Sequence, residues 1–248
     1  MKHFFRLAAA CAALFTAVGA TSCTDAEQND NSGILRVKLA VDATATTRAE
    51  QTLTAPEISD FDLSITSADE SYSNHWESLS DLTSETRFEV GEYNLAATCG
   101  DITNEAFDAP CFGATSSCRI LPNQTTLVNM TATLANCGVR VTQSEAFLKY
   151  FSDWTISLVS AAGTTIPFVE GEERTAYIAP AKFKIKVTFT KPNGTTGSRT
   201  IKVSDVQPRT IYTVRMDVNE GEVGESQIVI RFDDSVTTEN IEIEIDEQ

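Results

Sequence analysis

Histidine, methionine and tryptophan are scarce in this 248-residue chain, which contains two His, three Met and two Trp. Because His3 lies in the N-terminal segment, His75 is the single histidine of the remaining sequence. So few histidines disfavour a His-ligated metal site and leave one candidate base for a Ser or Cys triad. The G-x-S-x-G, phosphate-loop and EF-hand motifs are missing as well. We therefore expect no metal, no cofactor and no enzymatic activity.

Positive charge is also in short supply, with 19 Lys and Arg against 35 Asp and Glu and a formal net charge of −16. This balance argues against binding to nucleic acid. It also argues against attachment to anionic lipid headgroups through basic patches. Beyond the N-terminal segment, the sequence has no apolar run long enough to cross a bilayer as a helix.

The N-terminus has the organisation of a secretory signal. Lys2 and Arg6 precede an apolar run over residues 7–20, which is shorter than the roughly 20 residues of a membrane-spanning helix. This length is typical of the hydrophobic region of a signal peptide. We therefore predict that residues 1–22 are a lipoprotein signal peptide.

Small residues ending at Ser22 lead directly to Cys23. The pattern resembles a lipobox, although Ala20 stands where Leu is commoner. It predicts cleavage between Ser22 and Cys23 and lipidation of the Cys23 thiol, which would anchor the protein in the outer membrane. The alternative is an ordinary secretory signal cut near Ala20, with Cys23 as a passive residue.

Residues 23–33 are polar and acidic without periodicity, which predicts a flexible tether between lipid and fold. Asp25, Glu27 and Asp30 follow the lipid cysteine closely. They resemble the acidic export signal of Bacteroidales surface lipoproteins, and a cell-surface location follows from this resemblance. A solvated linker is the alternative.

Apolar and polar residues alternate with a period of two along most of the remaining chain, which is typical of half-buried antiparallel strands. Ser144 to Phe151 is the one helical segment expected, with Ser144 as a candidate N-cap. The pattern predicts an all-β protein of two tandem antiparallel β-sandwich modules, residues 34–136 and 137–248, with one extended sandwich as the alternative. The expected strands cover residues 35–41, 61–66, 88–90, 93–97, 128–134, 154–158, 183–189, 212–218, 228–232 and 241–245, with a turn at Gly91–Glu92 between the third and the fourth.

Four cysteines follow Cys23, namely Cys99, Cys111, Cys118 and Cys137. In an oxidising compartment their even number predicts two disulfides, for which three pairings are possible. The alternatives are buried free thiols and a metal site, which the spacing disfavours.

Two surface features suggest carbohydrate chemistry. Trp76 with neighbouring Tyr72 could stack on a sugar ring, although a tryptophan that closes the end of a sandwich is the commoner use. The triplet that begins at Asp234 and contains Ser235 resembles the O-glycosylation signal of Bacteroidales exported proteins.

Six short segments resemble, in their order and spacing, a family of uncharacterised Bacteroidales surface lipoproteins with a domain of unknown function. The segments are SGILRVKLAVD, TTRAE, FDLSIT, FEVGEYNLAAT, AFDAPCFG and TLANCGVRV. That family is similar to the fimbrillins, pilus and adhesin subunits with two transthyretin-like β-sandwiches. The resemblance therefore implies a non-enzymatic surface protein of cell adhesion or of a pilus.

The fimbrillin resemblance also implies a mechanism. An arginine-specific protease would cut after Arg48 and release the first strand, residues 35–41, so that a strand of another subunit fills the groove. Residues 241–245 are the candidate donor strand. Alternatively, the first strand stays in its own sheet, Arg48 is an ordinary loop residue, and the acidic tail is an edge strand. The partners implied are membrane lipid, other fimbrial subunits or a host ligand. The alternative function is a surface glycan-binding lipoprotein of a polysaccharide-uptake system.

Overall fold

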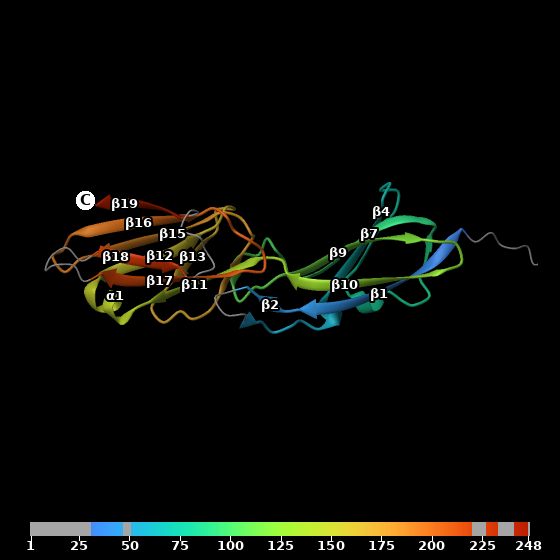
Figure 1. Cartoon of the computed structure of the whole chain (residues 1–248), viewed down its shortest axis with the longest axis horizontal. Helices are drawn as coiled ribbons and strands as arrows, with labels where there is room; N and C mark the ends of the chain where they lie inside the picture. The colour runs from blue at the N-terminus through green and yellow to red at the C-terminus, as the bar shows by residue number, and fades with distance from the viewer. Residues whose placement is uncertain (1–30, 47–50, 220–226, 233–240, 248) are drawn as a thin grey trace, which may run out of the picture. The chain divides into compact units, whose positions relative to one another are not determined.

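The computed structural model describes residues 31–46, 51–219, 227–232 and 241–247, and its regular structure is almost entirely β (Figure 1). The predicted all-β fold class is thereby confirmed. The helices within these ranges are α1 (Glu145–Tyr150) and the 3-10 turns Ile58–Asp60 and Leu79–Asp81. Each of them is too short and too polar to be a membrane-spanning helix.

The largest sheet has seven strands in the order β5-β4-β7-β9-β10-β1-β6. All neighbouring pairs are antiparallel except β1 and β10, which run parallel. The strands are β1 (Ser32–Asp42), β4 (Asp62–Ser67), β5 (Ser73–Trp76), β6 (Arg87–Glu89), β7 (Gly91–Cys99), β9 (Phe112–Ile120) and β10 (Thr125–Leu134).

Two five-stranded sheets follow, in the orders β18-β17-β11-β14-β8 and β13-β12-β15-β16-β19. In the first, β11 and β17 again form a parallel pair. Its strands are β8 (Ala106–Phe107), β11 (Cys137–Gln143), β14 (Ala176–Ile178), β17 (Ile211–Asn219) and β18 (Gln227–Phe232). Those of the second are β12 (Ser152–Val159), β13 (Thr165–Phe168), β15 (Phe183–Thr190), β16 (Thr196–Val203) and β19 (Ile241–Glu247). A two-stranded ribbon joins β2 (Thr44–Ala45) to β3 (Gln51–Thr52).

The buried apolar side chains form two clusters. The first core gathers side chains of the seven-stranded sheet, and its largest fully buried members are Phe61, Phe112, Leu35, Leu63, Ile65, Leu95, Ile120 and Leu134. The second core lies among the five-stranded sheets, and its largest fully buried members are Phe147, Phe168, Phe183 and Tyr212. Phe107 on β8 packs edge-on against Phe168 with 5.2 Å between ring centroids, so the chain between β7 and β9 contacts the second core.

Helix α1 begins as the sequence predicts. The Ser144 hydroxyl accepts a hydrogen bond of 3.1 Å from the Phe147 amide, which confirms Ser144 as the N-cap. Phe147 is fully buried in the second core and thereby holds the helix against it.

Candidate functional site

Strand β1 is paired unequally on its two edges. One edge runs parallel to β10 over nine residues, from Ile34 opposite Thr125 to Asp42 opposite Thr133. The other edge pairs with β6 through residues 32–34 alone. Within the described residues, the stretch from Leu35 onward therefore has a strand partner on one side, which makes β1 nearly an edge strand.

The inward face of β1 is nevertheless part of the first core. Leu35 is fully buried and Leu39 is 9% exposed, while Val37 and Val41 pack against the same cluster at partial burial. These four side chains alternate with outward-facing residues, as the sequence predicts for positions 35–41. Loss of β1 would uncover both the β10 backbone and the apolar cavity that these side chains fill.

The chain after β1 forms the ribbon β2–β3, in which Thr44 pairs with Thr52. The predicted protease site, Arg48, falls between these two strands, in residues 47–50, outside the described residues. Its position in sequence places it after the last residue of β1 and before the first residue of β4.

Arg209 holds the end of β1. Its guanidinium donates to the Asp42 carboxylate (2.5 Å), the Thr44 carbonyl (2.8 Å) and the Thr44 hydroxyl. A backbone hydrogen bond adds to these contacts: the Thr46 amide donates to the Arg209 carbonyl at 2.7 Å. Arg209 adopts a left-handed conformation, with φ at 61°. We call this group (Asp42, Thr44, Thr46 and Arg209) the β1 clamp.

The Asp42 carboxyl group is held in its ionised form. Hydrogen bonds from the hydroxyl and amide of Thr44, and then from Arg209, hold the pKa of Asp42 below its usual range. The clamp is therefore a charged contact at neutral pH.

The C-terminal strand β19 pairs with β16 over seven residues, from Gly197 opposite Glu247 to Val203 opposite Ile241. It lies at the edge of its sheet. The predicted donor segment, residues 241–245, thus forms an antiparallel edge strand in the sheet of the same chain.

The aromatic pair singled out in the sequence lies at the end of the first core. Trp76 is partly buried and packs on Phe88, with 6.3 Å between ring centroids. Tyr72 meets Phe88 and Tyr93 edge-on and keeps 36% of its surface exposed. Of the two candidate stacking residues, Tyr72 has the more accessible ring.

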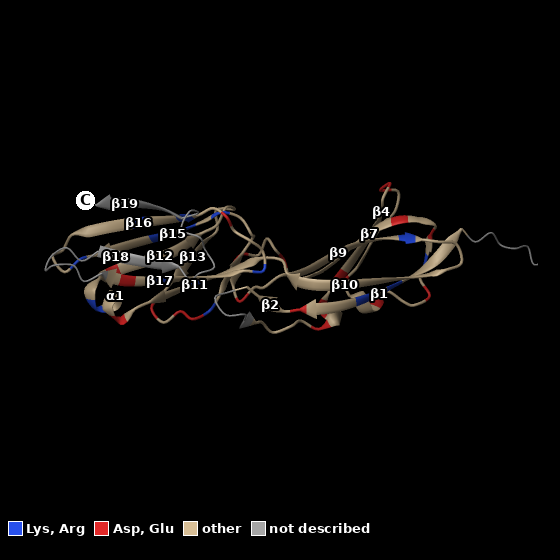
Figure 2. Cartoon of the chain, in the orientation of Figure 1, with Lys and Arg blue, Asp and Glu red and all other residues tan. Residues whose placement is uncertain are grey.

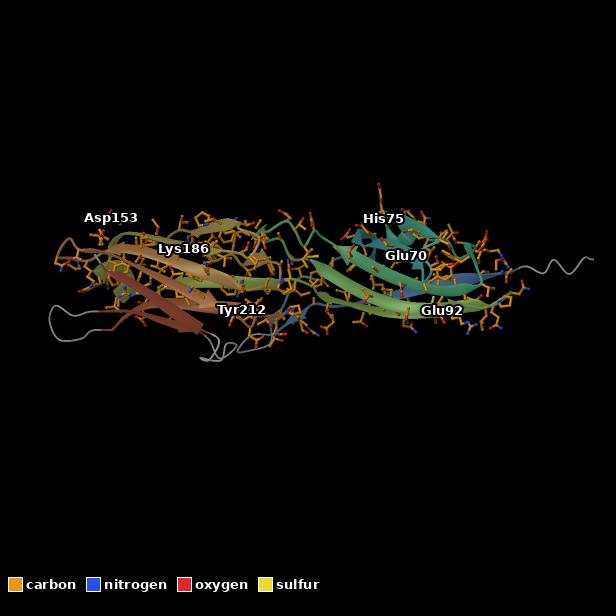
Figure 3. All side chains as sticks on the ribbon, turned by 90° about the horizontal axis from the view of Figure 1, so that it is seen from above. Glu70, His75, Glu92, Asp153, Lys186 and Tyr212 are labelled. Atoms are coloured by element: carbon orange, nitrogen blue, oxygen red, sulfur yellow. The ribbon has the colours of Figure 1, made fainter. Side chains whose placement is uncertain are left out.

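A hollow of about 520 Å³ lies on the outward faces of β4, β7 and β9. His75 on the neighbouring strand β5, labelled in Figure 3, shares a hydrogen bond of 3.1 Å with Ser64. Most side chains around the hollow carry a hydroxyl or amide group, and Leu95 and Ala96 complete the lining. The polar ones are Ser64, Thr66, Asn94, Thr115, Ser116 and Ser117. Such groups can donate and accept hydrogen bonds with a polar, uncharged ligand.

The predicted disulfides are not present, because Cys99, Cys111, Cys118 and Cys137 are all free thiols. Cys99 lies opposite Phe112, whereas Cys118 lies opposite Tyr93, six residues along β7. That separation is roughly 20 Å, too long for a disulfide. Cys137 is fully buried in the second core, with its thiol directed at the Ile178 carbonyl at 3.6 Å. Burial raises its pKa to about 12.

Three other predicted site residues, Ser22, Cys23 and Ser235, lie outside the described residues. In the part of the chain that is described, no group of three or more His, Cys, Asp or Glu is placed to hold a metal ion.

The β1 clamp is the feature that the sequence did not reveal. Asp42 and Arg209 are 167 positions apart, and each looks like an ordinary charged loop or strand residue. Arg209 follows Pro208 and precedes a strand, a context that signals a turn but no partner.

A family model described as "Domain of unknown function (DUF4493)" matches residues 31–247. No curated protein matches the sequence significantly.

Among solved structures, the chain is similar to a protein of Bacteroides eggerthii provisionally assigned to cell adhesion. Identity is 10%, the TM-score is 0.42, and the match covers 87% of this chain and 94% of the other. A Bacteroides thetaiotaomicron protein provisionally assigned to polysaccharide binding matches at 11% identity and a TM-score of 0.41, over 84% and 99% of the two chains. The fimbrial anchor protein Mfa2 of Porphyromonas gingivalis matches at 11% identity and a TM-score of 0.37, over 81% and 97%.

Proposed function

The chain belongs to the DUF4493 family, and from this premise we propose that it is a non-enzymatic surface lipoprotein acting in cell adhesion or as a pilus component. In this proposal Cys23 carries the lipid that anchors the chain in the outer membrane. Residues 34–136 and 137–248 are the two proposed sandwich modules. Most residues of each core come from one module, although Tyr177 and Ile211 join the first core and β8 pairs with β14.

The observation that carries the pilus version is the one-sided pairing of β1. Because β1 is paired along one edge for most of its length, it can leave its sheet by breaking the β10 ladder and the three-residue ladder with β6. The β10 edge and the cavity of Leu35 and Leu39 would then accept an extended strand with alternating apolar residues, as in β-strand addition.

The position of Arg48 supports the same proposal. Cleavage after Arg48 would separate β1, and with it any lipid on Cys23, from the rest of the chain. It would also cut the covalent connection between Asp42, Thr44 and Thr46 and their partner Arg209. The strand would then be held by its ladders with β10 and β6, by its buried side chains and by the β1 clamp.

Strand β19 is the proposed donor. It is an edge strand with one paired ladder, so it can exchange partners at the cost of its contacts with β16 alone. The alternating sequence of residues 241–246 suits a groove that takes every second side chain.

An arginine-specific protease tests the pilus version. The purified chain is digested under native conditions, and the fragments are sequenced from their N-termini. We expect one early cut that yields an N-terminus at Ala49, followed by oligomers on size-exclusion chromatography.

Arg48→Lys is the matched control, because it keeps the charge and removes the cleavage site. Oligomers that form equally well with Arg48→Lys, or a wild-type chain that is cut at Arg48 and stays monomeric, would exclude strand exchange triggered at this site. A monomeric adhesin would be compatible with that result.

The anchor is tested separately. We expect the wild-type chain in the membrane fraction, with an acylated N-terminal peptide that begins at Cys23 in mass spectra. A Cys23→Ala chain that fractionates in the same way as the wild type would refute the lipid anchor.

A surface glycan-binding role is the second candidate, and the hollow on β4, β7 and β9 favours it. Its hydroxyl and amide groups suit hydrogen bonds to a neutral sugar. Thr115→Arg and Ser117→Arg would block the hollow. Glycan-array binding that survives both substitutions would count against this site.

A further inference from the structure

The point at which the described chain begins is fixed against the turn between β9 and β10. The Asn123 amide donates to the Ser32 carbonyl at 2.8 Å, and the Ile34 amide donates to the Gln124 carbonyl at 2.8 Å. Gly33 allows this approach, because a Cβ there would come within 2.4 Å of the Leu121 carbonyl oxygen. Residue 31 therefore lies beside the turn of residues 121–124.

Basic side chains gather at this end of the seven-stranded sheet. Arg36 and Lys38 face outward on β1, which carries blue segments in Figure 2. Arg119 is exposed on β9, and its carbonyl accepts a hydrogen bond from the Thr126 hydroxyl at 3.3 Å. Arg87 lies at the same end, where it donates to the Ser32 hydroxyl at 2.8 Å. Apart from Arg48, these are the Lys and Arg residues of positions 31–136, so the scarce positive charge of this half is concentrated here.

Exposed apolar side chains lie among these basic groups. Leu127 pairs with Arg36 in the β1–β10 register and is 59% exposed, although it faces solvent on a strand. Leu121, in the turn beside Gly33, is 39% exposed. We call Arg36, Lys38, Arg119, Leu121 and Leu127 the basal patch.

Carboxylates reduce the positive charge on the β4 and β7 side of this end of the sheet. Glu92 lies opposite Arg119 in the β7–β9 register, and Glu89 lies opposite Ser32. Asp69 and Glu70 lie beside Glu92, because the Ala68 amide donates to the Glu92 carbonyl at 2.8 Å. On β1, β9 and β10, by contrast, the basic residues Arg36, Lys38 and Arg119 are accompanied by one acidic residue, Asp42, at the other end of β1.

The length of the segment that precedes the first described residue bears on which surface can reach the basal patch. Between a lipid on Cys23 and the first described residue lie residues 24–30, a segment that spans at most about 25 Å when fully extended. A lipid headgroup region is therefore within reach of the patch, which lies where this segment joins the fold.

We propose that the basal patch rests on the anionic headgroup surface of the membrane that holds the Cys23 lipid. This inference depends on the acylation in the proposed function and adds a second contact to it. Arg36, Lys38 and Arg119 would meet phosphate oxygens, and Leu121 and Leu127 would enter the interface. Because the tether holds the fold close to the membrane, the effective concentration of headgroups at the basal patch is high, and a weak contact suffices to orient the fold. The negative net charge of the whole chain argues against attachment to anionic lipid through basic patches, but the basal patch itself is locally basic.

Vesicle binding without the lipid tests the patch. Residues 23–248 carrying Cys23→Ser are sedimented with phosphatidylglycerol–phosphatidylcholine vesicles and with pure phosphatidylcholine vesicles. We expect binding to the anionic vesicles at low salt, and its loss at high salt. Each basic residue near an anionic surface contributes about fivefold, so Arg36→Gln with Arg119→Gln should weaken binding by roughly 25-fold.

Matched controls exist elsewhere on the chain. Lys184→Gln with Lys186→Gln makes the same change of charge on exposed positions of β15 and should alter binding by less than about twofold. Leu127→Ser should weaken binding, whereas Val169→Ser should not, although Val169 is equally exposed at 60%.

Equal loss in the two charge variants, or no binding of the parent chain to anionic vesicles, would overturn the proposal. The anchor itself is scored independently from the acylated peptide of the wild-type chain. If the wild-type chain is acylated but the lipid-free chain binds no vesicles, the membrane contact of the basal patch is refuted and the proposed lipid anchor is supported. If the lipid-free chain binds anionic vesicles but the wild-type chain is never acylated, the lipid anchor is refuted and the affinity of the basal patch for anionic lipid is supported.

Discussion

Arg209 and Asp42 form an ion pair with 2.5 Å between guanidinium nitrogen and carboxylate oxygen, although 167 positions separate them in sequence. The pair ties the end of the first strand to the chain just before β17. Both side chains are about one-third exposed, so solvent screens the attraction. Its role in this protein is to position β1 rather than to supply most of its stability.

A double-mutant cycle measures this contact. Asp42→Asn and Arg209→Gln should each lower the urea midpoint of unfolding modestly, and the double variant should lose less than the sum of the two single effects, because the two side chains contact each other. Urea unfolding of the two single variants and the double variant provides the values. Additive effects would show that Arg209 acts through Thr44 and not through the carboxylate.

The turn between β4 and β5 predicts a pH dependence. The Asp69 carboxylate accepts hydrogen bonds from the Ser67 hydroxyl (2.6 Å) and from the hydroxyl and amide of Ser71 (2.8 and 3.1 Å). These bonds lower its pKa from 3.8 to about 2. A lowered pKa means that the stabilisation is complete above pH 3.8 and is lost as the pH falls through about 2.

Asp69→Asn should therefore flatten the decrease of the melting temperature between about pH 4 and pH 2. Thermal melts followed by circular dichroism at several pH values in this range make the comparison. Glu70→Gln removes an equal charge from the same turn and serves as the control. A wild-type profile that both substitutions flatten equally would point to net charge instead of the Asp69 hydrogen bonds.

Truncation of two leucines of the β1–β10 pair should affect stability to very different extents. Leu35 is fully buried, and Leu35→Ala should cost about 2–5 kcal/mol through lost burial and the cavity left behind. Leu127 is 59% exposed, and Leu127→Ala should change stability by less than about 0.5 kcal/mol. Denaturant midpoints of the two variants test this contrast. Similar losses would mean that Leu127 packs more tightly than its exposure indicates.

The sequence predicted the strands in which strongly apolar residues alternate, and β1 is a good example. It did not predict β9, whose inward positions after Phe112 include Ala114, Ser116 and Cys118. Such small side chains leave a weak periodic signal, and the strand is placed by its neighbours β7 and β10. The pattern over residues 88–97 predicts two strands that flank a turn at Gly91–Glu92. Two strands, β6 and β7, are present, but Gly91 is already the first residue of β7.

The candidate site was predicted less completely, because its parts depend on distances in the folded chain. The identity of residues 35–41 as a strand follows from alternation, but its free edge follows from the sheet order. The ion pair of Asp42 with Arg209 leaves no local signal at all. The even number of cysteines suggested disulfides, since composition does not record that Cys137 faces the second core.

Thiol chemistry gives a last prediction, which separates free cysteines from disulfides. Cys137 is fully buried in the second core, and burial raises its pKa to about 12, so the reactive thiolate is scarcely populated at pH 8. Burial also raises the pKa of Cys111, which is 4% exposed, and of the half-buried Cys99 and Cys118. A maleimide at pH 8 should therefore label native Cys99 and Cys118 slowly and Cys137 last, as mapped by peptide mass spectrometry. In guanidinium without reductant, all four should react at once. If any of the four reacted in guanidinium only after a reductant was added, that residue would be in a disulfide in the isolated protein, and the free thiols of the structure would describe its reduced form.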